Sequence, residues 1–192
     1  MNNKNLNETE ELKFGIKVLE RDGEKVYFNL IANIIIDDVE YEILHPVDEE
    51  DYENVLIFEV DEYDYNLIRD PEEISNILTY YFDFLENEVL DNDGGVFIPA
   101  EDSLSGLFDE ENYDNVYLMT PENQVITFRQ TALIPFEEKM YFLGDLIYPD
   151  DYDCFIFEIT EIDGEPAFLL SLDEEINDSV LELYSQLIED ME

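Results

Sequence analysis

Cysteine, histidine and basic side chains are all scarce in this chain. The 192 residues hold one cysteine, one histidine and eight lysines and arginines, against 52 aspartates and glutamates. A single thiol excludes an intramolecular disulfide, and Cys154 has apolar neighbours, so we expect a buried or half-buried structural thiol. The shortage of bases gives a formal net charge of −44. This is far beyond the magnitude of roughly 2–8 that keeps a small domain soluble.

The charge imbalance indicates which partners the chain favours. Acidic chains are often disordered, but 45% of the residues are hydrophobic, so we expect a folded protein. Adaptation to a salty cytoplasm also enriches acids, yet this chain keeps the large apolar side chains that such adaptation usually trims. An anionic surface disfavours direct binding to nucleic acid or a membrane. It favours basic proteins, polyamines or divalent cations.

Long apolar runs are also missing. Residues 1–12 are polar and lack the apolar core of a secretory signal. The richest apolar stretch, Leu30 to Ile36, contains Asn33 and is far shorter than the ~20 residues that span a bilayer. We therefore expect a cytoplasmic protein.

The sequence does contain a weak internal repeat. A shift of 100 residues aligns 16–45 with 116–145 without a gap and pairs Phe28 with Phe128. Identity is low, but the apolar positions agree, as expected for two copies of one module. The alignment predicts a first repeat over 1–88, an acidic and partly ordered linker over 89–115, and a second repeat over 116–192.

Each repeat has the pattern of strands followed by a helix. Asp22-Gly23 lies between two strand-like runs and is a strong hairpin signal. Apolar residues recur at helical spacing over 74–85 and again over 176–188, which predicts two helices. Asp70 precedes the first of these ranges and is its predicted N-cap. The predicted fold class is α+β, with two tandem repeats, each an antiparallel β-meander of about five strands followed by one amphipathic helix. We expect each helix to cover its own sheet.

The sequence contains no motif that names a reaction. Cys154 and His45 are the only pair that could form a Cys–His nucleophile, but they fall in different repeats, and we interpret His45 as a surface or turn histidine. Residues 91–94 resemble part of a calcium loop, but its first and twelfth ligand positions fall on Val89 and Ala100. We predict a non-enzymatic protein with no catalytic, cofactor-binding or metal-ligating residues and no cofactor.

The first repeat resembles a known family. The run from Val39 to Glu50, VEYEILHPVDEE, followed by VLIFEV, is similar to the YrzB-like family, a domain family of unknown function. The second repeat is more diverged and has Gly144-Asp145 where Leu44-His45 stand. The resemblance implies a small acidic cytoplasmic protein of Gram-positive bacteria and says almost nothing about mechanism.

Three functions are compatible with these observations. We favour an interaction module that binds a basic protein partner through its acidic surface, with exposed aromatic side chains adding specificity. A second hypothesis is a nucleic-acid mimic that inhibits a DNA- or RNA-binding protein, which needs carboxylates in rows. A third is a divalent-cation-binding protein or a metal-dependent enzyme. The simplest oligomeric arrangement is a monomer whose repeats are related by a pseudo-twofold axis.

Residues expected to contact the partner come from two groups. The first is tyrosines next to acids, which combine an apolar ring with a polar tip. The second is the acids at the ends of the two predicted helices, where they oppose the helix dipole. The predicted partner-binding residues are Tyr63, Tyr65, Tyr113, Glu86, Glu88, Glu189 and Asp190.

Overall fold

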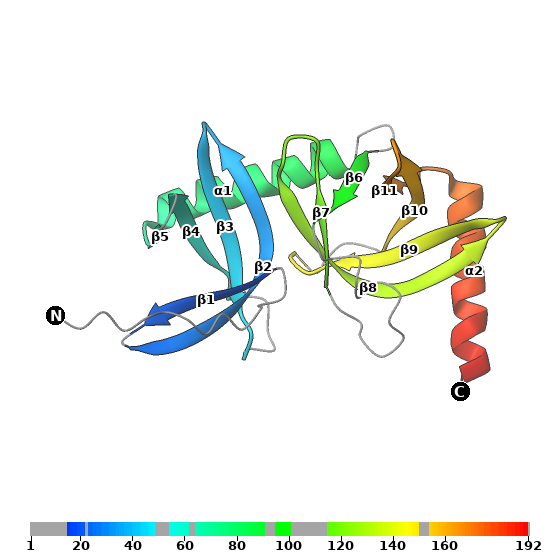
Figure 1. The fold of residues 1–192 in the computed structure, drawn as a ribbon, viewed down its shortest axis with the longest axis horizontal. Helices are drawn as coiled ribbons and strands as arrows, with labels where there is room; N and C mark the ends of the chain where they lie inside the picture. Colours follow the sequence, from blue (N-terminus) through cyan, green and yellow to red (C-terminus); the bar gives the residue numbers. More distant parts are fainter. Residues whose placement is uncertain are drawn as a thin grey trace.

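Strands dominate the described part of the chain. The computed structural model describes residues 15–21, 23–48, 54–61, 64–90, 95–100, 115–149 and 154–191. Among these residues, eleven strands form one antiparallel sheet, and two α-helices pack against it (Figure 1). This combination confirms the α+β class. No helix in these ranges is long and apolar enough to cross a membrane.

The elements follow one another in two halves. The strands of the first half are β1 (Ile16–Arg21), β2 (Glu24–Ile36), β3 (Val39–Pro46), β4 (Leu56–Asp61) and β5 (Asp64–Leu67). They lead into α1 (Pro71–Phe84), which continues as a π-helical stretch, η1 (Leu85–Leu90). The second half contains β6 (Val96–Pro99), β7 (Asn115–Met119), β8 (Val125–Phe136), β9 (Lys139–Leu146), β10 (Phe155–Ile162), β11 (Glu165–Leu170) and α2 (Glu174–Met191).

The two halves share one sheet, so the prediction of two tandem repeats of meander and helix is wrong. β2 pairs with β8 through Ala32–Ile126 and Asn33–Val125. β6, which falls within the predicted linker, lies between β7 and β11. Because β8 also pairs with β9, six strands close into a ring in the order β8, β7, β6, β11, β10, β9. The pairing has a physical reason, since it satisfies backbone groups that separate modules would leave on open strand edges.

One hydrophobic core also crosses the boundary between the halves. Ile43 of β3 and Ile57 of β4 belong to the same buried cluster as Phe142 and other aromatic residues of the six-stranded ring. Within the ring, Phe128 and Phe157 meet edge to face with their ring centroids 5.2 Å apart. The halves therefore bury apolar surface against each other, which is the main stabilising contribution in a domain of this size.

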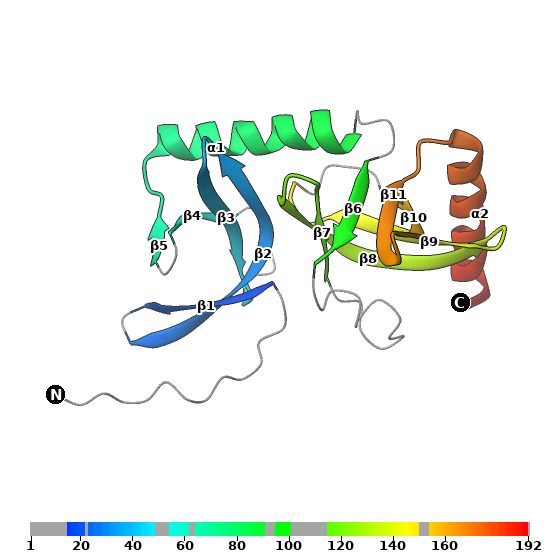
Figure 2. The same cartoon turned by 45° about the horizontal axis from the view of Figure 1, so that its top comes forward.

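α1 ties the two halves together. The Asp70 side chain accepts hydrogen bonds from the backbone N–H groups of Glu72 at 2.9 Å and Glu73 at 3.3 Å, as the sequence predicted for an N-cap. Farther along, Tyr81 is fully buried and its hydroxyl donates to the carbonyl of Tyr148 at 2.8 Å. α1 thus lies across both halves (Figure 2), which corrects the expectation that it covers only its own strands.

A second contact between the halves is made by Tyr117 of β7. Its ring is buried in a cluster with Phe28 and Phe58, which come from the first half. Gly15, just before β1, has φ +82° and lies directly against this ring. A Cβ at position 15 would lie 2.0 Å from Cζ of Tyr117, so only glycine fits there.

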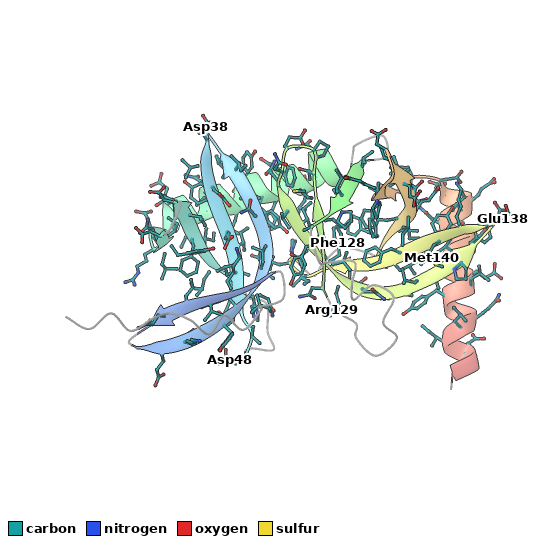
Figure 3. The ribbon with its side chains drawn as sticks, in the orientation of Figure 1. Asp38, Asp48, Phe128, Arg129, Glu138 and Met140 are labelled. Carbon is teal, nitrogen blue, oxygen red and sulfur yellow. The ribbon has the colours of Figure 1, made fainter. Side chains whose placement is uncertain are left out.

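Two hairpin turns hold acidic residues in the left-handed backbone region. Asp37 and Asp38 join β2 to β3 with φ of 50° and 65°, and Glu137 and Glu138 join β8 to β9 with φ of 49° and 68°. Figure 3 shows Asp38 and Glu138 at the two hairpin tips. Two-residue turns of this geometry prefer Asn-Gly, and a non-glycine residue costs roughly 1–2 kcal/mol in the left-handed conformation.

Replacing Asp37-Asp38 by Asn-Gly is expected to raise the free energy of unfolding by about 1–2 kcal/mol, because the strained position is relieved and the register is unchanged. Urea unfolding of the full chain measures this. Asp163→Asn with Glu165→Gln is the matched control, since it also removes two charges and the Asp163-Gly164 turn already has glycine at its second position, so stability should change little. Equal effects from both substitutions would mean that lost negative charge, rather than backbone strain, sets the stability.

Candidate interaction surface

α2 is placed by a cap and an apolar face. The side chain of Asp173 accepts hydrogen bonds from the backbone N–H groups of Glu175 at 3.0 Å and Ile176 at 3.3 Å, which fixes where the helix begins. Val180 is fully buried against the outer face of β8, β9 and β10. The cluster around it contains Ile134, Tyr141, Leu143, Ile156, Ile176, Leu183 and Tyr184.

The earlier turns of α2 pack against β8, β9 and β10, and its C-terminal turns extend beyond the edge of these strands (Figure 1). Leu187 lies seven residues after Val180 and therefore on the same face of the helix, yet it is 48% exposed. Ile188 is 44% exposed and Leu181 is 39% exposed. We call Leu181, Leu187 and Ile188 the distal strip. It is an apolar surface on an element that is otherwise anchored in the core.

All charged side chains of α2 are acidic. The helix sequence, EEINDSVLELYSQLIEDM, has six acids and no base, and no basic residue lies in its last turn. Glu182 and Glu189 are both exposed. Acids near a helix C-terminus oppose the helix dipole and cost ~0.3–1 kcal/mol, so helix stability does not explain them.

The predicted partner-binding residues do not form one surface. Glu189 is exposed at the end of α2, whereas Glu86 is exposed in η1 and Tyr65 belongs to β5, at the opposite end of the molecule from α2 (Figure 1). Glu88 and Asp190 lie in η1 and α2, but their side chains are outside the described ones. Tyr63 and Tyr113 lie outside the described residues.

Tyr65 is half-buried in a cluster that sequence reasoning did not find. The ammonium of Lys17 lies 2.6 Å from Oε1 of Glu42 and 3.3 Å from the hydroxyl of Tyr65, and the Tyr65 ring meets Phe58 edge to face. Glu42 is 3% exposed, and its Oε2 atom has no hydrogen-bond partner among the described residues. The three side chains come from β1, β3 and β5, so no local sequence pattern links them.

This cluster shifts the ionisation of its members. Burial alone would lower the pKa of Lys17, but the hydrogen bond and the charge of Glu42 outweigh it and raise the pKa. Burial and then the charge of Glu42 raise the pKa of Tyr65. Within the described ranges, the buried carboxylate of Glu42 is paired with Lys17, and such a pair is sensitive to loss of either partner.

Two further sequence expectations concern possible catalytic side chains. Cys154 is half-buried and packs against the cluster that anchors α2, which confirms the expected burial. His45 is 1% exposed, so its interpretation as a surface or turn histidine is wrong, because β3 continues through Pro46 and carries the imidazole inside. In the ranges that the structure describes, no three His, Cys, Asp or Glu side chains gather as metal ligands.

Comparisons with protein-family models, with curated proteins and with solved structures find no match to this chain. The resemblance to the YrzB-like family stays a prediction.

Proposed function

We propose that this protein is a non-enzymatic interaction module that binds a basic protein partner through the exposed side of α2. The observation that carries the proposal is the charge of that helix, which has six acids and no base along 18 residues. The acids at its C-terminal end cost stability, so a role outside folding accounts for them better. A partner that carries lysines and arginines would offset that cost.

The whole molecule supports the same partner class. A net charge of −44 attracts cationic proteins over distances of about a Debye length and speeds their association. Such attraction sets the on-rate and excludes anionic competitors, while apolar contacts at the centre of an interface supply most of the affinity. We therefore expect binding to weaken steeply as the salt concentration rises.

A nucleic-acid mimic is the alternative, and the spacing of the acids supports it less well. Glu174, Asp178 and Glu182 follow one another at four-residue intervals, which places them in one row along α2. The helix rise puts successive carboxylates of this row roughly 6 Å apart. One strand of B-DNA carries a phosphate about every 3.4 Å of axis, so the row has about half that charge density.

The test is capture of partners from bacterial lysate on the tagged full chain, with elution by stepped salt and identification by mass spectrometry. The test variant carries Glu182→Gln, Glu189→Gln and Asp190→Asn, which removes acids from the C-terminal half of α2 and leaves its first turn intact. A control variant loses the same number of charges in the first half through Asp37→Asn, Asp38→Asn and Asp48→Asn. We expect a defined basic partner that the α2 variant releases at lower salt than the control does.

Two outcomes would change the proposal. If both variants release the same mixture of basic proteins at low salt, the surface of α2 has no special role. If the partner is a nucleic-acid enzyme or binding protein that DNA displaces in competition, mimicry is the better account.

A further inference from the structure

The distal strip has the form of an unfilled helix-packing surface. Leu181 and Ile188 lie seven residues apart on one side of α2, and Leu187 continues the row that buries Val180. The strip therefore covers about two turns, or roughly 10 Å along the helix. An apolar surface of this shape matches the apolar stripe of a second helix packed along α2.

The charges beside the distal strip indicate which kind of second helix could pack there. Glu182 and Glu189 each follow a strip residue in the sequence and are exposed, so two carboxylates line the strip at a seven-residue spacing. A second copy of α2 would bring six more acids to the contact, and like charges at helix spacing repel. An anionic membrane or nucleic acid is disfavoured for the same reason. A helix with lysines or arginines beside its apolar stripe is complementary.

We propose that the distal strip docks an amphipathic basic helix of the partner, with the apolar stripe of that helix on Leu181, Leu187 and Ile188 and its cations over Glu182 and Glu189. This proposal rests on the proposed function and adds to it the shape and the position of the contact. The partner helix continues the packing that α2 begins against the sheet, so α2 has apolar contacts on the sheet at one end and on the partner at the other.

The probe is a synthetic Leu/Lys peptide of about 18 residues with leucines at i, i+3, i+4 and i+7, long enough to form helix on binding. A scrambled peptide of the same composition has the same charge but no stripe. Both are labelled and titrated with the full chain by fluorescence anisotropy at about 0.15 M salt. The protein variant is Leu187→Glu with Ile188→Glu, and Ile162→Glu is the control, because Ile162 is similarly exposed at the end of β10.

The glutamate substitutions separate apolar contact from simple attraction. They add negative charge, so they strengthen any purely electrostatic binding, and glutamate is a good helix former that keeps α2 intact. We expect the double variant to bind the amphipathic peptide at least about tenfold more weakly than the original chain, while the scrambled peptide binds the same or slightly more tightly. Ile162→Glu should leave both affinities unchanged. Circular dichroism checks that the helix content is retained.

Several results would overturn the inference. Equal affinity of the two peptides for the original chain would show that only charge is recognised. That result would leave the proposed function in place but would rule out an amphipathic helix as the occupant of the distal strip. Unchanged binding of the amphipathic peptide to the double variant would place the contact elsewhere. Sedimentation that shows a dimer abolished by the double variant would assign the strip to a second copy. Failure of both peptides to bind would contradict this inference and the proposed function together.

Discussion

Replacing Lys17 by methionine is expected to lower the free energy of unfolding by about 2–4 kcal/mol, because the buried carboxylate of Glu42 loses the ammonium that it pairs with. The side chain of Glu42 is 4% exposed and that of Lys17 is 30% exposed. Water reaches the ammonium in part, so the effect lies toward the lower end of the range for fully buried pairs. Urea unfolding followed by circular dichroism measures the change.

Lys139→Met is the matched control for this experiment. Lys139 pairs with Glu158 at 2.8 Å, but both side chains are much more exposed, at 50% and 24%. Its removal should change stability little. Combining Lys17→Met with Glu42→Leu removes both charges of the pair, places an apolar side chain opposite Phe58 in the sheet, and should restore much of the lost stability. Equal losses from Lys17→Met and Lys139→Met would show that Glu42 is not held by its buried pair.

The same cluster makes stability depend on alkaline pH. The pKa of Lys17 is raised in the folded state above its ordinary value of 10.5, and that of Tyr65 above 10.0. A raised pKa contributes stability that is fully present below the unfolded value and is lost as pH rises through the folded value. We therefore expect unfolding to become easier above about pH 10. Lys17→Met should remove the part of this loss that comes from Lys17, while tyrosines with a raised pKa, such as Tyr65 and Tyr148, keep the rest. An unchanged profile in the variant would exclude Lys17 as the source.

Replacing Gly15 by alanine is expected to destabilise the fold by about 2–5 kcal/mol. The left-handed backbone at this residue penalises a Cβ by roughly 1–2 kcal/mol, and forcing the Tyr117 ring aside costs roughly 1–3 kcal/mol. Because Tyr117 joins the two halves, the strain falls on the contact between them. Thermal and urea unfolding of the variant give the size of the loss.

Gly23→Ala separates the two contributions to that loss. Gly23 has φ +85°, close to the +82° of Gly15, but no atom of the described part of the chain lies within 4 Å of the added Cβ. Its variant should show only the backbone penalty of roughly 1–2 kcal/mol. If the two alanine variants lose the same stability, Tyr117 is not packed on Gly15 and this link between the halves is incorrect.

Local features of this fold were predictable because they depend on neighbours in the sequence. The sequence predicts a hairpin at Asp22-Gly23, and Gly23 lies between the paired strands β1 and β2, whereas Asp22 is outside the described residues. Asp163-Gly164 forms the turn between β10 and β11. The N-cap at Asp70 is also where the sequence placed it. Each signal acts within a few residues, through turn geometry or a side chain that accepts from nearby N–H groups.

Contacts between the halves were not predictable from the same signals. The self-similarity of the sequence reports apolar positions, but it does not say which strand edges pair, so β2–β8 pairing and the six-stranded ring were missed. The ion pair of Lys17 with Glu42 spans 25 residues and depends on how β1 and β3 are placed relative to each other in the first half. Periodicity also placed Leu187 on the same face as Val180, but only the structure shows that Leu187 is 48% exposed whereas Val180 is buried.

The most direct test of the account is chemical-shift mapping of the isotopically labelled full chain during titration with the amphipathic Leu/Lys peptide. The account predicts that the shifted amides cluster on α2, around Leu181 to Glu189, and that the shifts disappear as salt is raised. Shifts spread evenly over the acidic surface, or centred on the first half, would contradict the assignment of α2 as the surface that binds a basic partner.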